Sequence, residues 1–512
     1  MLKFSILFKS HMVLQRGKRI PVWGTSDPGA RITVSMQGQT AYATADEKGT
    51  WTVHLAPLAA SFEEKMLITS GDEQIELQDV QVGEVWLAGG QSNMEFHMRY
   101  DADMAHEKDH CFNDSIRFFD YPKVSYVGQI DEADYLKEYG FWRKAAPDQL
   151  ERFSAVAYYF AKDLQKDLGV PVGIIGCNWG GSPACAWMSR EAVIEGGGSI
   201  YLDEYNETLR SLDMDAYEEA YKNNPLVRVT DQLANPINDL MMFGVPEDEE
   251  FELPPYVPVI GPKHEWRPCG LYESMLSEVV PVGLRGIIWY QGETDGDRHP
   301  EIYETLFPSL IRNWRQLWNE ELPFLFVQIA PLDHWLECDG VPYVEIRAAQ
   351  QYTADTINGT GMAVITDVGM KNDIHPKKKQ PVGHRLALLA ENKVYHEDVL
   401  CEAPTLTGMH VEDGRITLTF DHAGDGLYLA ENAPYGQKVG DKKLGGLQIF
   451  QNGKELSSDM MTALAEGSHV MITGKEICAD IPTRVKLAKT GWYLVNLYNS
   501  AGIPARPCEI TN

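Results

Sequence analysis

One serine in this chain lies where a nucleophile would be expected. The segment GEVWLAGGQSNM (83–94) contains an apolar run that stops at two glycines and leads to Ser92. A β-type run that ends in Gly-Gly-x-Ser predicts a hydroxyl at the carboxyl end of a strand, where open α/β sheets carry their ligands. A serine nucleophile also needs an adjacent base and amide donors for the oxyanion. Ser92 is therefore a candidate nucleophile, although Gly, Ser and Asn are also typical of a plain turn or helix cap.

The segment differs from the G-x-S-x-G elbow of α/β-hydrolases. Ser92 is followed by Asn93 and Met94, so the second glycine of that signature is missing. The nucleophile hypothesis therefore depends on partners elsewhere in the chain.

A candidate base lies in the segment Asp373-Ile374-His375-Pro376, which precedes the apparent helix VGHRLALLA. As general base, His375 would take the Ser92 proton and return it to the leaving alcohol, and Asp373 could fix the imidazole tautomer. The chain contains 14 histidines, and a histidine is often structural or exposed. The assignment of His375 therefore rests on its neighbours.

Two further segments follow apolar strand candidates and could donate to an oxyanion. In WYQGETD (289–295), Gln291 offers a side-chain N–H, and in CNWGGS (177–182), Gly180 and Gly181 offer backbone amides. A capping turn before a helix explains the first segment equally well, and a plain Gly-Gly turn explains the second.

Residues of the same segment are also compatible with two other kinds of site. Glu293 and Asp295 could form a glycosidase carboxylate pair, but two carboxylates two residues apart are common. His299, Asp295 and Asp297 could hold a metal, yet the chain has no H-E-x-x-H motif or Cys/His ligand spacing. We therefore expect no metal.

The strand and helix candidates around these residues indicate a parallel sheet with helices on both faces. Between about 81 and 395, apolar strand candidates alternate with helical stretches. The clearest helix is 155–168, where apolar residues recur at spacings of three and four. Short β runs separated by turns occupy residues 11 to about 80 and return beyond about 400, which predicts a β-sandwich segment and a second β-rich module.

Three parts are therefore expected along the chain: 1–80, 81–395 and 396–512. Within the second part, residues from about 195 to 265 are acidic and Pro-rich. Such a stretch is too long for a simple βα connection, so it predicts an insertion or lid.

The composition excludes several classes of partner. With 512 residues, 44% of them hydrophobic and 23% charged, the chain is an ordinary folded protein that is larger than a single core. A formal charge of -29 repels phosphate backbones and anionic membranes, so neither nucleic acid nor membrane is expected. The same field opposes anionic substrates slightly, although the cluster Lys377–Lys379 could offset it locally if it is more than a solvated face.

Cysteine usage and the amino terminus lead to an expected compartment. Eight cysteines are spread without a C-x-x-C pair, which is typical of free thiols. The start MLKFSILFKSHMVLQR has a short apolar segment and no small-residue cleavage site, and no apolar run is long enough for a transmembrane helix. We therefore expect a cytoplasmic location.

Taken together, the motifs GQSNM, NWGGS, WYQGETD and DIHP, in this order, resemble the sialate O-acetylesterase family of SGNH-type hydrolases. The resemblance extends to HMVLQRGKRIPVWG near the start, GLYESML at 270–276 and LYNSAGIPARP near the end, so it spans nearly the whole chain. It implies a three-layer α/β/α hydrolase domain attached to β-sandwich modules. It also implies removal of acetyl groups from sugar hydroxyls without a cofactor.

The resemblance further implies a role for each motif residue. Ser92 would be the nucleophile and His375 the base, and the oxyanion donors would be the Ser92 amide, a Gly180 or Gly181 amide and the Gln291 side chain. SGNH hydrolases place the acid three residues before the histidine, where this chain has Asn372. The acid is therefore Asp373, another carboxylate such as Asp367 or Glu293, or absent, which would leave a Ser-His dyad.

The expected partner is a small acetylated sugar or oligosaccharide, foremost an O-acetylated sialic acid. Two alternatives stay open: an esterase for acetyl xylan or another acetylated carbohydrate, and a non-catalytic carbohydrate-binding protein built on the β modules. A homo-oligomer is also an open possibility.

Overall fold

The computed structural model describes residues 2–131, 139–223, 233, 236–244, 259–432, 434, 438–440 and 442–512. The chain divides into two compact units. The first contains Met1–Trp289 and Thr305–Phe324, and the second contains Tyr290–Glu304 and Leu325–Asn512.

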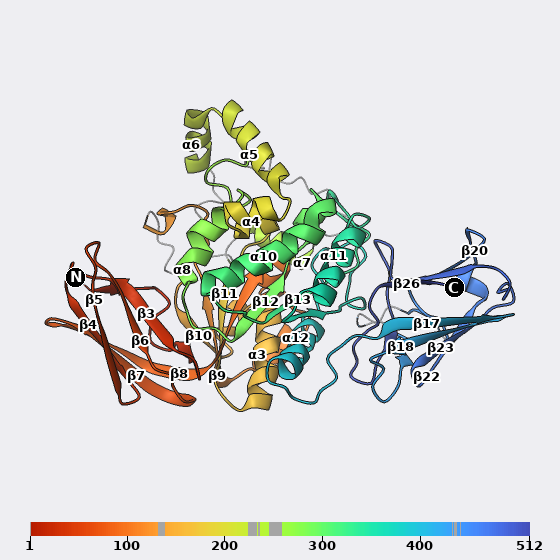
Figure 1. The fold of residues 1–512 in the computed structure, drawn as a ribbon, viewed down its shortest axis with the longest axis horizontal. Helices are drawn as coiled ribbons and strands as arrows, with labels where there is room; N and C mark the ends of the chain where they lie inside the picture. The colour runs from red at the N-terminus through yellow and green to blue at the C-terminus, as the bar shows by residue number, and fades with distance from the viewer. Residues whose placement is uncertain are drawn as a thin grey trace. The chain divides into compact units, whose positions relative to one another are not determined.

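The first unit begins with a module of β-strands (Figure 1). One sheet has the strand order β1 (Lys3–Phe4), β3 (Ile20–Thr25) and β6 (Thr50–Leu55). The strands β4 (Arg31–Met36), β5 (Gln39–Thr44), β7 (Ser61–Ser70) and β8 (Glu73–Gly90) pair in a second sheet, and β2 (Val13–Gln15) runs parallel to β8. Buried and less buried residues alternate along β4 and β6, which is the pattern of strands with one face on a core. The predicted N-terminal β segment is thus present.

One long strand, β8, joins this module to a central sheet. Its first half pairs antiparallel with β7, and its second half pairs parallel with β11 (Val172–Asn178). The strand is continuous through Val80 and Val82, both fully buried. The division expected at residue 80 therefore falls inside a single strand, because the apolar run continues from the module into the sheet.

The central sheet of the first unit has the strand order β10 (Trp142–Ala145), β9 (Asn113–Asp120), β11, β8 and β12 (Gly286–Tyr290). Strand β11 runs parallel to both β9 and β8, as predicted, but the edge strand β10 runs antiparallel to β9. The sheet is therefore mixed. No α-helix separates β9 from β10 among the described residues, and antiparallel neighbours need no helical crossover.

Helices cover both faces of this sheet. The helix α3 has the predicted bounds, Ala155–Leu168, and its Phe160 contacts Trp86 of β8 edge-on at 5.1 Å between ring centroids. Gly89 lies three residues after Trp86 in β8. A Cβ added at Gly89 would lie 2.9 Å from Trp314 of α10 (Tyr303–Trp318). Because side chains alternate across a strand, positions 86 and 89 face opposite sides. The first unit is thus a three-layer α/β/α structure (Figure 1).

The remaining described helices of the first unit are short. They are α1 (Ser92–Glu95), α2 (Met104–His110), α4 (Arg190–Glu195), α5 (Ser199–Ser211), α6 (Met214–Asn223), α7 (Pro236–Phe243) and α8 (Ser277–Val279). The insertion predicted at 195–265 is helical where it is described, in α5 to α7, and its remaining residues lie largely outside the described ranges.

The second unit contains an α/β part and a β module. Strands β13 (Phe324–Val327) and β16 (Thr360–Ala363) are neighbours, and α11 (Tyr343–Thr356) and α12 (Gln380–Lys393) contact β16. This part also holds α9 (Glu293–Gly296) and the hairpin of β14 (His334–Trp335) and β15 (Cys338–Asp339).

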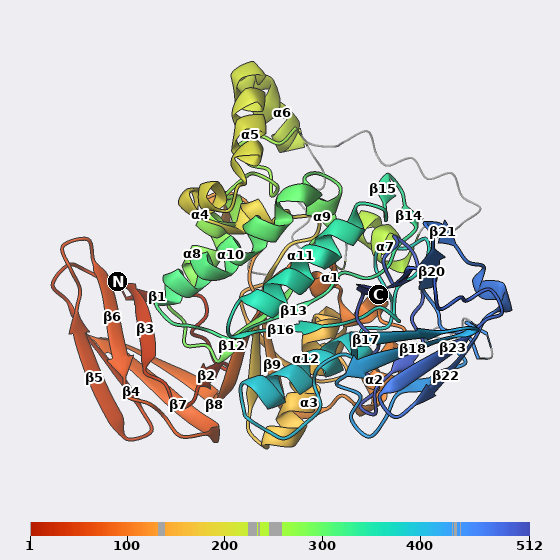
Figure 2. The ribbon, with the colours of Figure 1, turned by 45° about the vertical axis from the view of Figure 1, so that its right-hand side comes forward.

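The C-terminal module consists of two four-stranded antiparallel sheets and a short strand pair (Figure 2). The first sheet has the order β17 (Thr405–Glu412), β18 (Arg415–Asp421), β23 (His469–Thr473) and β22 (Thr462–Glu466). The second has the order β21 (Lys454–Glu455), β20 (Leu447–Gln451), β24 (Thr483–Leu487) and β26 (Cys508–Thr511), and β19 (Tyr428–Leu429) pairs with β25 (Leu497–Tyr498). Both sheets contribute to one apolar core, which includes Leu418 and Val470 from the first and Ile449 and Val485 from the second. The predicted C-terminal β-rich module is thus a sandwich.

Two further facts concern the chain as described. Every described helix is too short or too polar to traverse a lipid bilayer. All eight cysteines lie in the described ranges, and none of them forms a disulfide.

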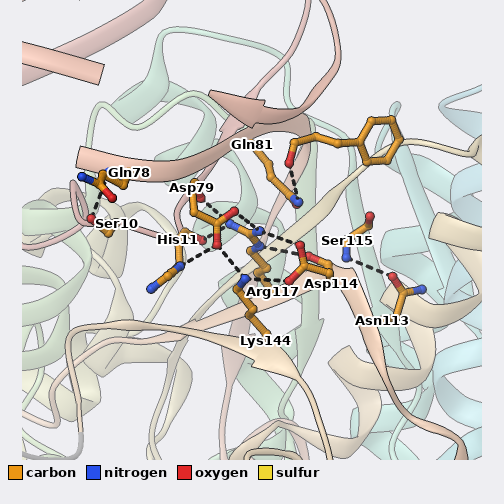
Figure 3. A network of polar contacts seen from close by, with 11 residues as sticks. Ser10, His11, Gln78, Asp79, Gln81, Asn113, Asp114, Ser115, Arg117 and Lys144 are labelled. Atoms are coloured by element: carbon orange, nitrogen blue, oxygen red, sulfur yellow. Dashed lines mark hydrogen bonds and ion pairs between the residues drawn. The ribbon is translucent and has the colours of Figure 1, made fainter. Parts of the chain in front are cut away.

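A buried arginine ties the N-terminal module to the central sheet (Figure 3). The fully buried Arg117 of β9 donates to the Asp79 carboxylate at 2.8 Å and to the backbone oxygens of Asp79 and His11 at 2.6 and 2.9 Å. The same carboxylate lies 2.6 Å from Lys144 of β10 and 2.7 Å from the His11 ring. Asp79 therefore links three strands, β8, β9 and β10.

The charge on Asp79 stabilises this junction. Burial opposes ionisation of Asp79, but hydrogen bonds from Lys144, Arg117 and His11 outweigh burial and hold its pKa well below the usual range. Such a carboxylate contributes stability above the pKa of an unfolded aspartate, about 4, and the contribution is lost as the pH falls toward the folded pKa.

We predict that Asp79→Asn lowers the free energy of unfolding by about 2–4 kcal/mol at pH 7, because buried Arg117 then keeps only the more distant Asp114 as ion partner. Asparagine tolerates the positive φ of this position, +52°, so the backbone is not the cause. In urea unfolding, the difference from the wild type should shrink below about pH 4.

Asp114→Asn is a suitable control for this prediction, because Asp114 contacts the same Lys144 and Arg117 but its side chain is 49% exposed. Its effect should stay below about 1 kcal/mol. An Asp79→Asn deficit that is the same at pH 3 and pH 7 would contradict the ion-pair account.

Candidate active site

Ser92 lies at the end of a tight turn after β8. The strand ends at Gly90, whose φ of +132° favours glycine, and α1 begins at Ser92. A Cβ at Gly89 would lie 2.9 Å from the rings of both Trp289 and Trp314, so a side chain at position 89 is excluded by crowding. The predicted turn is therefore present, and each glycine has its own physical reason.

The Gly-Gly loop after β11 runs beside Ser92. Asn178 is the register partner of Gly90, and the Trp179 amide donates to the Gly90 carbonyl at 3.0 Å. A Cβ at Gly180 would lie only 3.4 Å from the Cβ of Ser92. The structure thus brings together the proposed nucleophile and one of the segments predicted to donate to the oxyanion.

The two glycines of this loop differ in their surroundings. Gly181 has a φ of +74°, and an added Cβ would lie 3.0 Å from the indole nitrogen of Trp266, so it needs to be glycine. The Gly180 amide donates to the Glu95 carboxylate at 2.7 Å. In this arrangement the Gly180 N–H is directed at Glu95, on the far end of the same short helix that begins with Ser92.

Sequence reasoning missed a buried charge cluster behind this loop. The ammonium of Lys123 donates to the backbone and side-chain oxygens of Asn178, the latter at 3.0 Å, and lies 3.6 Å from Glu95 Oε2. Asn178 in turn donates to the Ala88 carbonyl of β8 at 3.1 Å. Glu95 follows GQSNM directly and could have been noticed from that, whereas nothing in the sequence marks Lys123.

Asp120 adds a third charged group nearby, at the carboxyl end of β9. Burial raises the pKa of Asp120 to about 6, the positive charge of Lys123 lowers it, and the negative charge of Glu95 raises it. Lys123 is therefore close enough to Asp120 to favour its charged form, and its ion-pair partner is Glu95.

In the second unit, Gln291 is fully buried and held in a fixed orientation. Its Nε2 donates to Asp295 at 2.5 Å, and its Oε1 accepts from the Tyr303 hydroxyl at 2.9 Å. The backbone oxygen of Gln291 accepts from Gln350 at 3.1 Å. An amide nitrogen carries two hydrogens, so the bond to Asp295 fixes the amide plane and with it the direction of the second hydrogen. Asp295 therefore acts on Gln291 and not as half of a carboxylate pair with Glu293.

His375 lies in a turn organised by Asp373. The Asp373 carboxylate accepts the backbone N–H of His375 at 2.8 Å and pairs with Lys377 at 2.8 Å. Its distance to His375 Nδ1 is 3.9 Å, which exceeds a hydrogen bond. The His375 ring also contacts Trp335 of β14 at 5.2 Å between centroids, with the rings nearly perpendicular. Asp373 therefore positions the His375 backbone in this structure.

The two alternative acids have different surroundings. Glu293 is buried at the start of α9 and lines a narrow hollow together with Asp373 and Tyr343. Asp367 is bound by both terminal nitrogens of Arg385 at 2.7 Å and accepts from the Tyr498 hydroxyl at 3.1 Å. Asp367 therefore fixes α12 to the C-terminal module, and both of its oxygens are committed there.

The basic cluster 377–379 is not a solvated patch. Lys377 pairs with Asp373, and burial lowers its pKa although Asp373 opposes this. Lys379 is fully buried, with its ammonium 5.4 Å from the centroid of the Tyr290 ring. Two of the three lysines thus hold the His375 turn in place.

Asp297, one of the possible metal ligands, has a different partner in the structure. Asp297 accepts from the Tyr343 hydroxyl at 3.1 Å, and burial raises the Asp297 pKa. Within the described ranges, no group of three or more His, Cys, Asp or Glu side chains is arranged to hold a metal ion.

Comparisons with known proteins find similarity to sialate O-acetylesterases. The family model of a carbohydrate esterase, the sialic acid-specific acetylesterase, matches residues 260–389, which include Gln291 and His375. Sialate O-acetylesterase of Mus musculus is 29% identical over 82% of this chain and 79% of its own length, and that of Homo sapiens is 26% identical over 77% and 71%. The chain is thus similar to sialate O-acetylesterases over most of its length, and residues 260–389 match the model of their family. It is a carboxylic ester hydrolase.

A solved structure of a family relative agrees in fold. The carbohydrate acetylesterase from Xanthomonas citri is 29% identical to this chain, covers 99% of both chains and superposes with a TM-score of 0.73. The predicted SGNH-type α/β fold with attached β modules is thereby confirmed, and the relatives support activity on O-acetylated sugars.

Proposed function

We propose that this esterase removes O-acetyl groups from sugars through an acetyl-enzyme on Ser92, with O-acetylated sialic acid as the substrate. The observation that carries the proposal is the turn after β8, which holds Ser92 in contact with the Gly180 loop. The name shared by the mouse and human relatives supports sialic acid as the sugar.

In the proposed reaction, Ser92 Oγ attacks the acetyl carbonyl while His375 takes its proton. Collapse of the tetrahedral intermediate breaks the bond to the sugar oxygen, and His375 returns the proton to that oxygen. Water, with its proton taken by His375, then attacks the acetyl carbonyl, the bond to Ser92 Oγ breaks, and His375 returns the proton to Oγ as acetate leaves. The Ser92 amide, the Gly181 amide and the Gln291 side chain would stabilise the oxyanion, since the Gly180 amide donates to Glu95, and no step needs a cofactor.

A second candidate function is removal of acetyl groups from a carbohydrate other than sialic acid. The Xanthomonas citri relative, which matches the full chain, is described as a carbohydrate acetylesterase without a stated sugar. Acetylated xylo-oligosaccharides are therefore the comparison substrate.

Ser92→Ala should abolish acetate release from 9-O-acetylated sialic acid, because no other group is proposed to carry the acetyl group. Acetate release is measured for wild type and variant on this substrate and on acetylated xylo-oligosaccharides. The exposed Ser457 of the C-terminal module provides a matched serine-to-alanine control that should keep wild-type activity. Faster release from the xylo-oligosaccharides would replace sialic acid by the second candidate, and retained activity in Ser92→Ala would contradict the mechanism.

Gln291→Ala should lower kcat about 100-fold or more, which is the usual effect of losing one oxyanion donor. The KM for p-nitrophenyl acetate should change little, because the donor acts mainly on the transition state. A kcat near that of the wild type would remove Gln291 from the site.

Asp373→Asn distinguishes a triad acid from a residue that holds the His375 backbone. The asparagine side-chain oxygen can still accept the His375 N–H, so we expect a loss of kcat of no more than about 10-fold. A triad aspartate replaced by asparagine typically costs about 10⁴-fold. A loss of that size would show that Asp373 acts on the imidazole, and Glu293→Gln serves as the parallel test of the other candidate acid.

A further inference from the structure

Glu95 connects the nucleophile to the oxyanion loop. It lies in the first helical turn after Ser92, within the four-residue helix α1, and it is 5% exposed. Its carboxylate accepts the Gly180 amide at 2.7 Å, the length of a charge-assisted hydrogen bond. Because one short helix carries both Ser92 and Glu95, this bond fixes how closely the loop approaches the serine.

The same position carries an electrostatic cost. A Cβ added at Gly180 would lie 3.4 Å from the Cβ of Ser92 and 3.5 Å from Glu95 Oε2. The carboxylate bound to the Gly180 amide is therefore near Ser92, where the oxyanion would develop. Two negative charges repel strongly in a site from which water is excluded. An isolated Glu95 charge would therefore oppose acetyl transfer.

Lys123 is placed to cancel that charge. Its ammonium is 3.6 Å from Glu95 Oε2, and its side chain is 4% exposed. Two hydrogen bonds to Asn178 hold it there, and Asn178 is itself bound to β8. The charge of Lys123 also lowers the pKa of Asp120, as do those of Arg143 and Arg152, but its ion pair is with Glu95.

We propose that Glu95 is a positioning residue that sets the Gly180 loop against Ser92, and that Lys123 neutralises the Glu95 charge during acetyl transfer. The proposal rests on the serine mechanism described above. Lys123 then affects the reaction rate through its charge. A charge effect can be separated from a structural one, because removing the Glu95 charge should raise the activity of a variant that lacks Lys123.

The test compares Lys123→Met, Glu95→Gln and the double variant, with p-nitrophenyl acetate as substrate. Lys123→Met should lower kcat by about 10- to 100-fold, comparable to the loss of one electrostatic contact in an active site, with KM within about 3-fold. Glu95→Gln keeps an acceptor oxygen for the Gly180 amide and should stay within about 3-fold of the wild type. The double variant should have a higher kcat than Lys123→Met, although the hydrogen bonds of Lys123 to Asn178 are not restored.

Two controls complete the design. Lys162→Met breaks another lysine–glutamate pair of the same unit, with Glu107 at 2.6 Å, and should leave kcat unchanged. Ser92→Ala separates the two proposals, because retained activity there would overturn the serine mechanism itself. Additive losses in the double variant, or a kcat of Lys123→Met within 2-fold of the wild type, would overturn the role of Lys123 alone.

A second comparison applies if Lys123→Met does not fold. Glu95→Ala removes the acceptor for the Gly180 amide, whereas Glu95→Gln retains one. The positioning role predicts at least a 10-fold lower kcat for Glu95→Ala than for Glu95→Gln, at similar KM. Equal kcat values for the two variants would overturn it.

Discussion

The candidate site depends on a steric constraint at the end of β8. Trp289 and Trp314 fill the space beside Gly89, and any side chain at that position would collide with both rings. The strand must therefore end in glycine on that face, and Gly90 then takes a backbone angle that favours glycine. Ser92 is placed by the close packing of large aromatic side chains, and the same packing forms the core between the sheet and α10.

A second constraint is the burial of charge around that serine. Glu95, Lys123 and Asp120 are each less than a tenth exposed, and burying an ion is expensive unless it is paired and hydrogen-bonded. Here the cost is offset by bonds that also define the site, since the Gly180 amide and the Asn178 oxygens are the partners. The net charge of -29 therefore does not describe the surroundings of Ser92, where buried Lys123 is paired with Glu95.

The sequence predicted those parts of the site that are local in the chain. Helix 155–168 follows from its apolar spacing, and the turns after β8, β11 and β12 follow from apolar runs that stop at turn residues. The His375 turn is less local, because residues 364–372 separate it from β16, and the sequence marked it by a histidine two residues after an aspartate, just before a helix. The pairing of Lys123 with Glu95 joins residues 28 positions apart through side chains, and no sequence periodicity reports such a contact.

Two expectations were changed by side-chain contacts that the structure shows. Asp367 was a plausible acid by its position near the motif, but Arg385, one helix later, binds both of its oxygens. The basic run 377–379 was typical of a solvated face, yet Asp373 and Tyr290 take up two of its lysines. Arg385 and Tyr290 are distant in the sequence from their partners, whereas Asp373 lies only four residues before Lys377.

The most direct test of this account is to identify the side chain that carries the acetyl group during turnover. The enzyme is mixed with p-nitrophenyl acetate, quenched in acid within the first turnovers, digested and analysed by mass spectrometry. The account predicts one acetyl group on the peptide that contains Ser92, and none on that peptide in Ser92→Ala. An acetyl group that accumulates on another side chain, at a rate that matches turnover, would contradict it.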